Sequence, residues 1–161
     1  MGQFTVPTDM SATIASVAQI TGGQLVETGG FLLGAVNTTD ATGLALTGDA
    51  GIERRKDLFQ VSGLALSVLF EWADDHGMTV IAQWHSHRLG AFLSPTDLKY
   101  GLNVRDFHTS VIPHYQNPSR DPADWGWWTY NGTSWAVSAP PRSTSSAFRT
   151  ITFEEGRVHE S

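Results

Sequence analysis

The pattern of apolar and polar positions along the chain follows two periods, which predict a mixture of helices and strands. The clearest helix is predicted over 62–76, where apolar residues recur at i, i+3, i+4 and i+7. Ser62 can cap its start and Gly77 can end it. A shorter stripe predicts a helix over 10–20, and the start signal Ser94-Pro95-Thr96-Asp97 predicts a third helix through about residue 103.

Short apolar runs bounded by glycine and polar residues predict strands between these helices. They lie at 31–36, 44–47, 78–84 and 107–112, and a hairpin is predicted around Asn131-Gly132. The run 78–84 is mostly apolar, as is typical of a central strand. The mixed charges of 53–57 favour a solvated loop. Helices and strands in mixed order predict an α/β sandwich, a mixed sheet with helices on its faces.

Chain length and composition bear on how this sandwich is organised. A length of 161 residues suits one domain, which we expect over 1–139. Beyond Ala139 the composition shifts to proline, arginine, serine and threonine. We therefore expect a C-terminal tail over 140–161, with an edge strand around 148–153.

Charge and residue usage exclude several classes of function. Sixteen acidic against ten basic residues give a net charge of −6, which disfavours nucleic acid as a partner. The absence of cysteine excludes disulfides and a thiolate nucleophile, and leaves imidazole and oxygen as metal ligands. No apolar run reaches the roughly 18 residues that span a bilayer, and residues 1–10 lack the pattern of a secretory signal. We therefore expect a cytoplasmic protein without a membrane partner.

Two histidines follow directly on the predicted central strand, as His85-Ser86-His87. Residues two apart on an extended chain point to the same side, so the two imidazoles should converge where the strand ends. Neutral imidazole is a common metal ligand. The pair on its own is compatible with two readings, a metal site and two buried core histidines.

Asp97 and Glu27 extend this pair. Asp97 belongs to a helix-capping pattern, and an acid in the first turn of that helix would face back toward the histidines. Two imidazoles, one carboxylate and an open fourth position describe a catalytic zinc site. Such a site needs a proton acceptor, for which Glu27 is the candidate; a solvated surface glutamate is the alternative. The glycines at 29 and 30 allow either close backbone approach or a bulge.

Together these residues resemble a known family. His85-x-His87, then Ser94-x-x-Asp97, with Glu27-Thr28-Gly29-Gly30-Phe31-Leu32-Leu33-Gly34 upstream, are similar to the JAMM motif of the MPN, or JAB, metalloprotease domain. Members of this family include deubiquitinating isopeptidases and their prokaryotic relatives. The resemblance runs from Glu27 to about Tyr130 and implies a single MPN-like, cytidine-deaminase-like fold.

The resemblance implies a role for each matching residue. His85, His87 and Asp97 would hold one zinc ion per chain, with water as the fourth ligand. Glu27 would act as general base and then as proton donor, and Ser94 would position the water or stabilise the oxyanion. The chain departs from the family in two places. Arg88 stands where proline is frequent, and six residues separate His87 from Ser94 where seven are usual.

The function that the resemblance implies is a zinc-dependent metallopeptidase. It would cleave the peptide or isopeptide bond after the C-terminal tail of a ubiquitin-like protein, by glutamate-assisted attack of a zinc-bound water. A ubiquitin-like protein or its conjugate would then be the partner. Two alternatives remain open: an inactive MPN scaffold, and a hydrolase of the same fold that acts on a small amide or a sulfur-carrier conjugate. The complete set of glutamate, histidines and aspartate favours activity.

Overall fold

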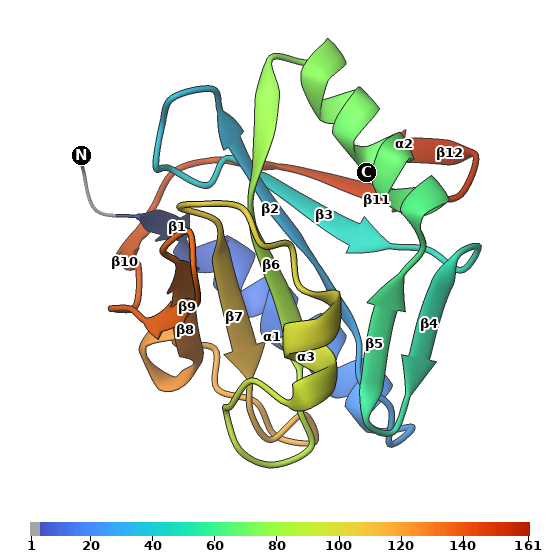
Figure 1. Ribbon diagram of the computed structural model, residues 1–161, viewed down its shortest axis with the longest axis vertical. Coiled ribbons are helices and arrows are strands. Elements are labelled where there is room, and N and C mark those ends of the chain that lie inside the picture. The colour runs from blue at the N-terminus through green and yellow to red at the C-terminus, as the bar shows by residue number, and fades with distance from the viewer. Residues whose placement is uncertain (1–3) are drawn as a thin grey trace.

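The computed structural model describes residues 4–161 and contains one large mixed sheet with helices packed on it (Figure 1). The helices are α1 (Thr8–Gly22), α2 (Gly63–Asp75), α3 (Pro95–Tyr100) and the short 3-10 helix η1 (Pro122–Asp124). The strands are β1 (Thr5–Pro7), β2 (Gly29–Ala35), β3 (Gly43–Thr47), β4 (Ile52–Arg55), β5 (Leu58–Val61), β6 (Met78–Ser86), β7 (His108–Ile112), β8 (Gly126–Tyr130), β9 (Trp135–Val137), β10 (Arg142–Thr144), β11 (Arg149–Glu154) and β12 (Arg157–Glu160).

The sheet has eight strands in the order β12-β11-β3-β2-β6-β7-β8-β9. Two neighbouring pairs are parallel, β11 with β3 and β6 with β7, and the other pairs are antiparallel. Two small sheets, β1 with β10 and β4 with β5, lie beside it. In the register of β2 and β6, Gly29 lies opposite His85. The segment that carries Glu27 is thereby brought next to the end of β6.

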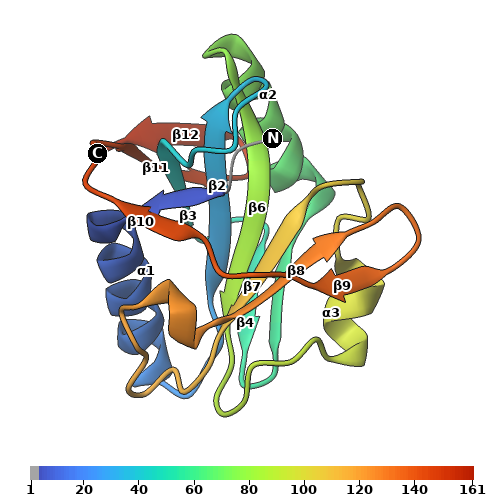
Figure 2. The ribbon, with the colours of Figure 1, turned by 90° about the vertical axis from the view of Figure 1, so that its left-hand side faces the viewer.

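Helices α1 and α2 lie on opposite sides of the sheet (Figure 2), and an apolar core lies on each side, which makes the domain a sandwich. On one face α1 packs through Met10 and Ile14 against a core that includes Leu32 and Trp84. On the other, α2 packs through Leu69 against a core that includes Phe31 and Leu33. Successive residues of β2 thus point to different cores, which explains why almost the whole strand is apolar. The predicted fold class, a mixed sheet with helices on its faces, is confirmed.

The long helix and the central strand follow the predicted pattern closely. Ser62 caps α2, because its hydroxyl accepts a hydrogen bond from the Ala65 amide at 3.1 Å. Gly77 follows with a φ of +66°, in the left-handed region that ends many helices. β6 then begins at Met78, as the apolar run predicts. No helix within residues 4–161 is both long and apolar enough to cross a membrane.

The expectation of a solvated loop at 53–57 is wrong, because these residues form most of β4 and the turn of the β4–β5 hairpin. Arg54 holds the hairpin against the main sheet. Its guanidinium donates to the Thr28 hydroxyl, to the carbonyl and hydroxyl oxygens of Thr47 and to the carbonyl of Gly48, at 2.8–3.1 Å. In a sequence, a charged residue that forms tertiary hydrogen bonds cannot be distinguished from one that faces solvent. For this reason the charges of 53–57 predicted a loop where the structure has a hairpin.

The segment after Ala139, expected as a tail with an edge strand, contributes β10, β11 and β12. β11 matches the predicted strand in position but lies inside the sheet, between β3 and β12. Its buried Ile151 and Phe153 complete the core under α2. The edge is formed by β12, whose mostly exposed polar residues suit an outer strand.

The glycines at 29 and 30 serve close backbone approach and not a bulge. A Cβ atom at Gly30 would collide with the carbonyl oxygen of Ala45 on β3 and lie 2.9 Å from the Trp84 ring. The irregularity of the β2–β6 register lies further along, between Leu32 and Leu33. Gly30 therefore lets β3 and the indole of β6 pack directly on β2.

Replacement of Gly30 by alanine should consequently destabilise the fold. We expect the free energy of unfolding to fall by about 3 kcal/mol, because overpacking against backbone cannot be relieved by a rotamer change. Gly63→Ala is the matched control, since nothing lies within 4 Å of a Cβ atom there, and its effect should stay within about 1 kcal/mol. Urea denaturation of both variants measures the difference. Equal stabilities would show that β2 and β3 separate at no cost.

Candidate metal centre

His85 and His87 converge at the end of β6. The alternation of the strand points both imidazoles to one side and Ser86 to the other. Their Nε2 atoms are 3.1 Å apart, and both residues are buried. The strand is fixed on both flanks, by β2 and by β7, so that the two rings are held in a rigid part of the sheet.

Asp97 reaches the histidines from the first turn of α3. The Ser94 hydroxyl accepts from the Asp97 amide at 3.1 Å, while the Ser94 amide donates to Asp97 Oδ2 at 2.9 Å, a complete capping box. This box orients the carboxylate. Oδ1 lies 3.2 Å from His85 Nε2, and Oδ2 lies 3.2 Å from His87 Nε2. The capping pattern and the predicted position of the carboxylate are thus two aspects of one local structure.

The three side chains form a group with the spacing that a metal ion requires, since one ligand atom from each lies within 4.8 Å of the others. Ligands about 2.0–2.1 Å from a tetrahedral zinc lie roughly 3.3 Å apart. The distances of 3.1–3.2 Å between the Nε2 and carboxylate atoms are close to that value. Two imidazoles and one carboxylate therefore fit a divalent metal.

The tautomer of His87 supports the same conclusion. Its Nδ1 lies 3.2 Å from the carbonyl oxygen of Gly90, which can only accept, so Nδ1 carries the hydrogen. In a neutral ring Nε2 then presents a lone pair toward Asp97 Oδ2. A cation between them, a proton or a metal ion, relieves this repulsion. Burial lowers the pKa of His87, but the hydrogen bond to Asp97 and the charges of Glu27 and Asp97 outweigh it and raise the pKa.

The carboxylate of Asp97 is held in its charged form. Burial alone would raise its pKa, but hydrogen bonds from His85 and His87, the charge of His85 and the Ser94 amide together lower the pKa well below its usual range. A metal ligand must be deprotonated to bind. The surroundings of Asp97 therefore prepare it for that role.

Glu27 lies beside the metal group in a buried position and not on the surface. Its amide donates to the carbonyl of Arg55 at 2.8 Å, which ties it to the β4–β5 hairpin. Its Oε1 is 3.5 Å from His87 Nε2, and the residue is 5% exposed. Burial raises its pKa to about 7; the charge of His87 opposes this shift, whereas those of Asp97 and Asp57 add to it. A carboxyl with such a pKa both takes up and releases a proton near neutral pH.

Ser86 is a site residue that the sequence analysis missed. It is fully buried, and its hydroxyl accepts from the Thr28 amide at 2.9 Å and donates to the Thr28 carbonyl at 3.3 Å. Thr28 follows Glu27 directly, so this contact fixes the glutamate relative to the two histidines. The sequence indicates that Ser86 needs a partner, because it is a polar residue on a buried strand, but the identity of that partner depends on the pairing of β2 with β6.

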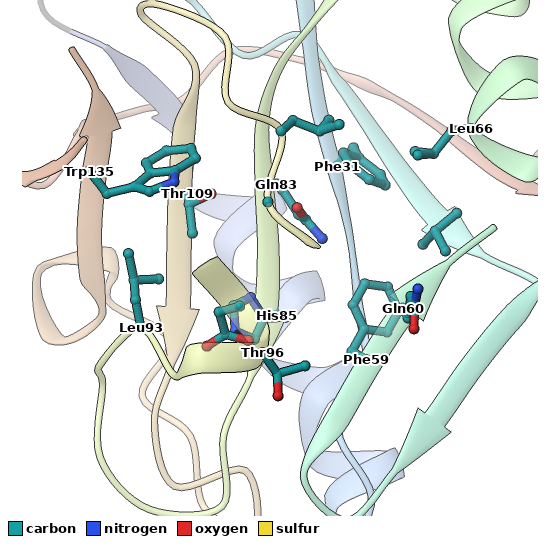
Figure 3. Close-up of a pocket in the computed structure, with 14 residues that line it drawn as sticks. Phe31, Phe59, Gln60, Leu66, Gln83, His85, Leu93, Thr96, Thr109 and Trp135 are labelled. Atoms are coloured by element: carbon teal, nitrogen blue, oxygen red, sulfur yellow. Dashed lines mark ion pairs between the residues drawn. The ribbon is translucent and has the colours of Figure 1, made fainter. Parts of the chain in front are cut away.

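Two cavities border the metal group, one on each side. The first, of about 230 Å³, is bordered by His85 and Asp97 and extends between β5 and β9. Figure 3 shows Phe59 and Gln60 on one side of it and Trp135 on the other. The second, of about 240 Å³, contains Glu27, His87 and Ser94. The sequence-predicted residues all lie in or between these cavities, while their chemical roles stay predictions.

Ser94 is placed in the second cavity with a free donor. Its oxygen accepts from the Asp97 amide, and within residues 4–161 its hydroxyl hydrogen has no acceptor. The side chain is therefore able to cap α3 and to donate to a ligand at the same time, because a hydroxyl offers one hydrogen in addition to its lone pairs.

Comparison with solved structures finds this fold in other proteins at low sequence identity, among them the following. A solution structure from Desulfitobacterium hafniense has a TM-score of 0.62 at 14% identity, covering 94% of this chain and 94% of that one. A solution structure from Salinibacter ruber has a TM-score of 0.57 at 19% identity, covering 89% and 94%. The crystal structure of a JAB1/MPN domain protein from Archaeoglobus fulgidus has a TM-score of 0.51 at 13% identity, covering 89% and 100%.

Sequence comparisons add nothing to this result, since no protein-family model and no curated protein matches the chain. The fold that the resemblance implies is confirmed by the structural neighbours. The chain therefore has an MPN-like fold, and a group of two histidines and one aspartate in it is suited to hold a metal ion.

Proposed function

We propose that this protein is a zinc-dependent hydrolase of the JAMM type, which cleaves the peptide or isopeptide bond after the C-terminal tail of a ubiquitin-like protein. One observation carries the proposal: a buried carboxyl, Glu27, lies 3.5 Å from a ligand atom of a complete metal-binding group. An inactive scaffold has no need of this arrangement, in which burial keeps the pKa of Glu27 near neutrality at a cost in stability.

His85, His87 and Asp97 would hold the zinc ion. Three protein ligands of imidazole and carboxylate type leave a position open, which is the pattern of catalytic and not of structural zinc sites. When bound there, zinc would supply Lewis acidity, which lowers the pKa of water and polarises a carbonyl group. The choice of zinc over other divalent ions rests on the donor set and on the resemblance to the JAMM motif.

Glu27 would move the proton. In hydrolysis the bond from the carbonyl carbon to nitrogen breaks and a bond to a water oxygen forms. Glu27 would accept a proton from the attacking water and deliver it to the departing nitrogen, so that the amine leaves in neutral form. Its pKa of about 7 suits both halves of this transfer.

Ser94 would stabilise the oxyanion. Its hydroxyl hydrogen is available to donate a hydrogen bond to the oxyanion. One such donor typically stabilises the transition state by about 3 kcal/mol. The capping box holds the backbone of Ser94 in place, so little reorganisation is needed during the reaction.

The cavity between β5 and β9 is suited to the acyl side of the substrate. Within the described residues β5 is paired with β4 alone, and Phe59, Gln60 and Val61 of β5 line the cavity. An extended, glycine-rich tail can add to such a strand through main-chain hydrogen bonds. His85 and Asp97 line the same cavity, so the carbonyl of the last tail residue would lie beside them.

A cleavage assay with and without chelator tests the proposal. Zinc-loaded protein is incubated with a linear ubiquitin-like fusion, a lysine-branched conjugate and a small-molecule amide of the same tail. We expect the tail to be released with a free carboxylate, the activity to be lost with chelator and to return with added zinc. Cleavage of the small amide alone would assign the protein to small-amide hydrolysis, and cleavage unaffected by chelator would overturn the zinc mechanism.

A further inference from the structure

The second cavity beside the metal group is formed by three separate segments. Glu27 comes from the residues before β2, Lys56 and Asp57 from the turn of the β4–β5 hairpin, and His87, Arg88 and Phe92 from the loop that follows β6. The cavity thus combines the proposed proton donor with side chains that the proposed mechanism does not use.

The position of Glu27 assigns this cavity to the leaving group, an assignment that rests on the proposed function. The group that takes the water proton must return it to the departing nitrogen, so the nitrogen has to be within its reach. Glu27 lines this cavity and is absent from the walls of the cavity that contains Phe59 and Trp135. A substrate that crosses the metal group would therefore place its acyl part on the His85 side and its amine on the Glu27 side.

The wall of the cavity is apolar next to the metal group. Phe92 meets the ring of His87 edge to face, with centroids 4.9 Å apart, and is 54% exposed. Leu89 lines the same cavity and is 66% exposed. Two exposed apolar side chains beside a polar centre provide a surface on which a four-carbon alkyl stem can pack.

The rim of the cavity carries two cations that have no partner in the described part of the chain. Lys56 and Arg88 are exposed, and no carboxylate of residues 4–161 forms an ion pair with either. Among the other arginines, Arg55, Arg149 and Arg157 are each paired with a glutamate. Arg105, Arg120 and Arg142 form no ion pair within the described residues either, but they lie outside this cavity. In a protein of net charge −6, two unpaired cations at the mouth of one cavity favour an anionic partner.

We propose that this cavity receives a lysine side chain whose neighbours in its own polypeptide are acidic, and that Lys56 and Arg88 select for those neighbours. The alkyl stem packs on Leu89 and Phe92, and the amine end faces Glu27 and Asp57. The acidic residues on either side of the lysine meet Lys56 and Arg88 at the rim. The acceptor of the ubiquitin-like tail is thereby defined as a lysine in an acidic stretch of an exposed chain.

The proposal is tested first by binding, without catalysis. Three peptides with a central lysine and aspartate, serine or arginine neighbours are titrated into zinc-loaded, 15N-labelled protein at low salt. The aspartate peptide should shift the amide signals of Lys56, Arg88 and Phe92 and bind about 10-fold more tightly than the arginine peptide, because two exposed charge pairs each contribute a few-fold. The preference should shrink in 0.5 M salt, which screens such pairs.

Charge reversal provides the matched comparison. In the double variant Lys56→Glu, Arg88→Glu the order of the three peptides should invert, whereas Arg142→Glu, an exposed cation on β10 outside the cavity, should leave it unchanged. Signal shifts outside this cavity, or equal binding of the three peptides, would overturn the inference.

Cleavage rates of the same peptides then distinguish a failure of this inference from a failure of the proposed function. The same peptides, acylated on the lysine with a glycine-ended tail, should be cleaved with kcat/KM in the order of binding, the difference residing in KM. Cleavage of all three at equal rates would overturn the selection by Lys56 and Arg88 while leaving the hydrolase intact. Selective binding without any cleavage would reject the hydrolase and leave the binding site standing.

Discussion

Replacement of Glu27 by glutamine should lower kcat by at least about 100-fold while the zinc content stays at one per chain, since positioned proton transfer typically contributes 10²–10⁴-fold. Glutamine has the size of glutamate but neither accepts nor returns the proton. The variant keeps all three proposed metal ligands, His85, His87 and Asp97. Rates on the branched conjugate and metal analysis of the same sample measure the two effects together.

The pH dependence of the free energy of unfolding, measured on the metal-free protein, is a second test of the Glu27→Gln replacement. The pKa of Glu27 is raised to about 7 in the fold from an ordinary value of 4.5, so its contribution to stability is full below about 4.5 and is lost as the pH rises through 7. Glu27→Gln should therefore gain stability relative to the unchanged protein between pH 5 and pH 8. Glu27→Asp is the control that keeps a carboxyl at this position. Unchanged turnover in Glu27→Gln would remove the residue from the mechanism.

Replacement of Asp97 by asparagine is expected to weaken zinc binding more than about 100-fold. Partners that only support a ligand already change metal affinity 10- to 100-fold, and Asp97 is one of the three proposed ligands themselves. Asparagine keeps an oxygen that can accept the Ser94 amide, so the capping box and α3 should survive. The loss is then one of metal binding and not of the helix.

Thermal unfolding with and without zinc tests this prediction through the zinc-dependent rise in Tm. A metal at 1,000 times its Kd stabilises the native state by about 4 kcal/mol, so the unchanged protein should show a large zinc-dependent rise in Tm. Asp97→Asn should show little of it at the same zinc concentration. Asp57→Asn, which alters a carboxylate in the neighbouring cavity but not in the metal group, should keep the full rise. An equal rise in Asp97→Asn would exclude Asp97 as a ligand.

The elements that could be predicted are those whose buried residues recur at the regular spacing of a helix or a strand. α2 and β6 have stripes and runs of apolar residues, because each packs against the core along its whole length. The β4–β5 hairpin could not be predicted in this way. Its order depends on Arg54, whose partners Thr28, Thr47 and Gly48 are supplied by other parts of the fold.

The position of β11 inside the sheet could not be predicted from its own residues either. Its alternation of Ile151 and Phe153 predicts a strand, but its parallel pairing joins residues about a hundred positions apart along the chain. Whether a strand ends as an edge or an interior strand is decided by what pairs with it. Here that is β12, a polar strand with little signal of its own.

More of the candidate site than of the fold could be predicted from the sequence. The spacing of His85 and His87 on a strand and the capping pattern of Asp97 each define a local geometry, and the two geometries meet. The burial of Glu27 and the contact of Ser86 with Thr28 follow from the pairing of β2 with β6, which no local pattern reports.

The placement of β12 at the outer edge of the sheet has a consequence for any polypeptide attached beyond Ser161. β12 is four strands away from β6, which at the usual spacing of about 4.8 Å puts nearly 20 Å between the attachment point and the metal group. A fluorescent reporter or a surface tether joined at this point would leave both cavities open. The chain is therefore well suited to immobilised or fused formats in which substrate has to enter freely.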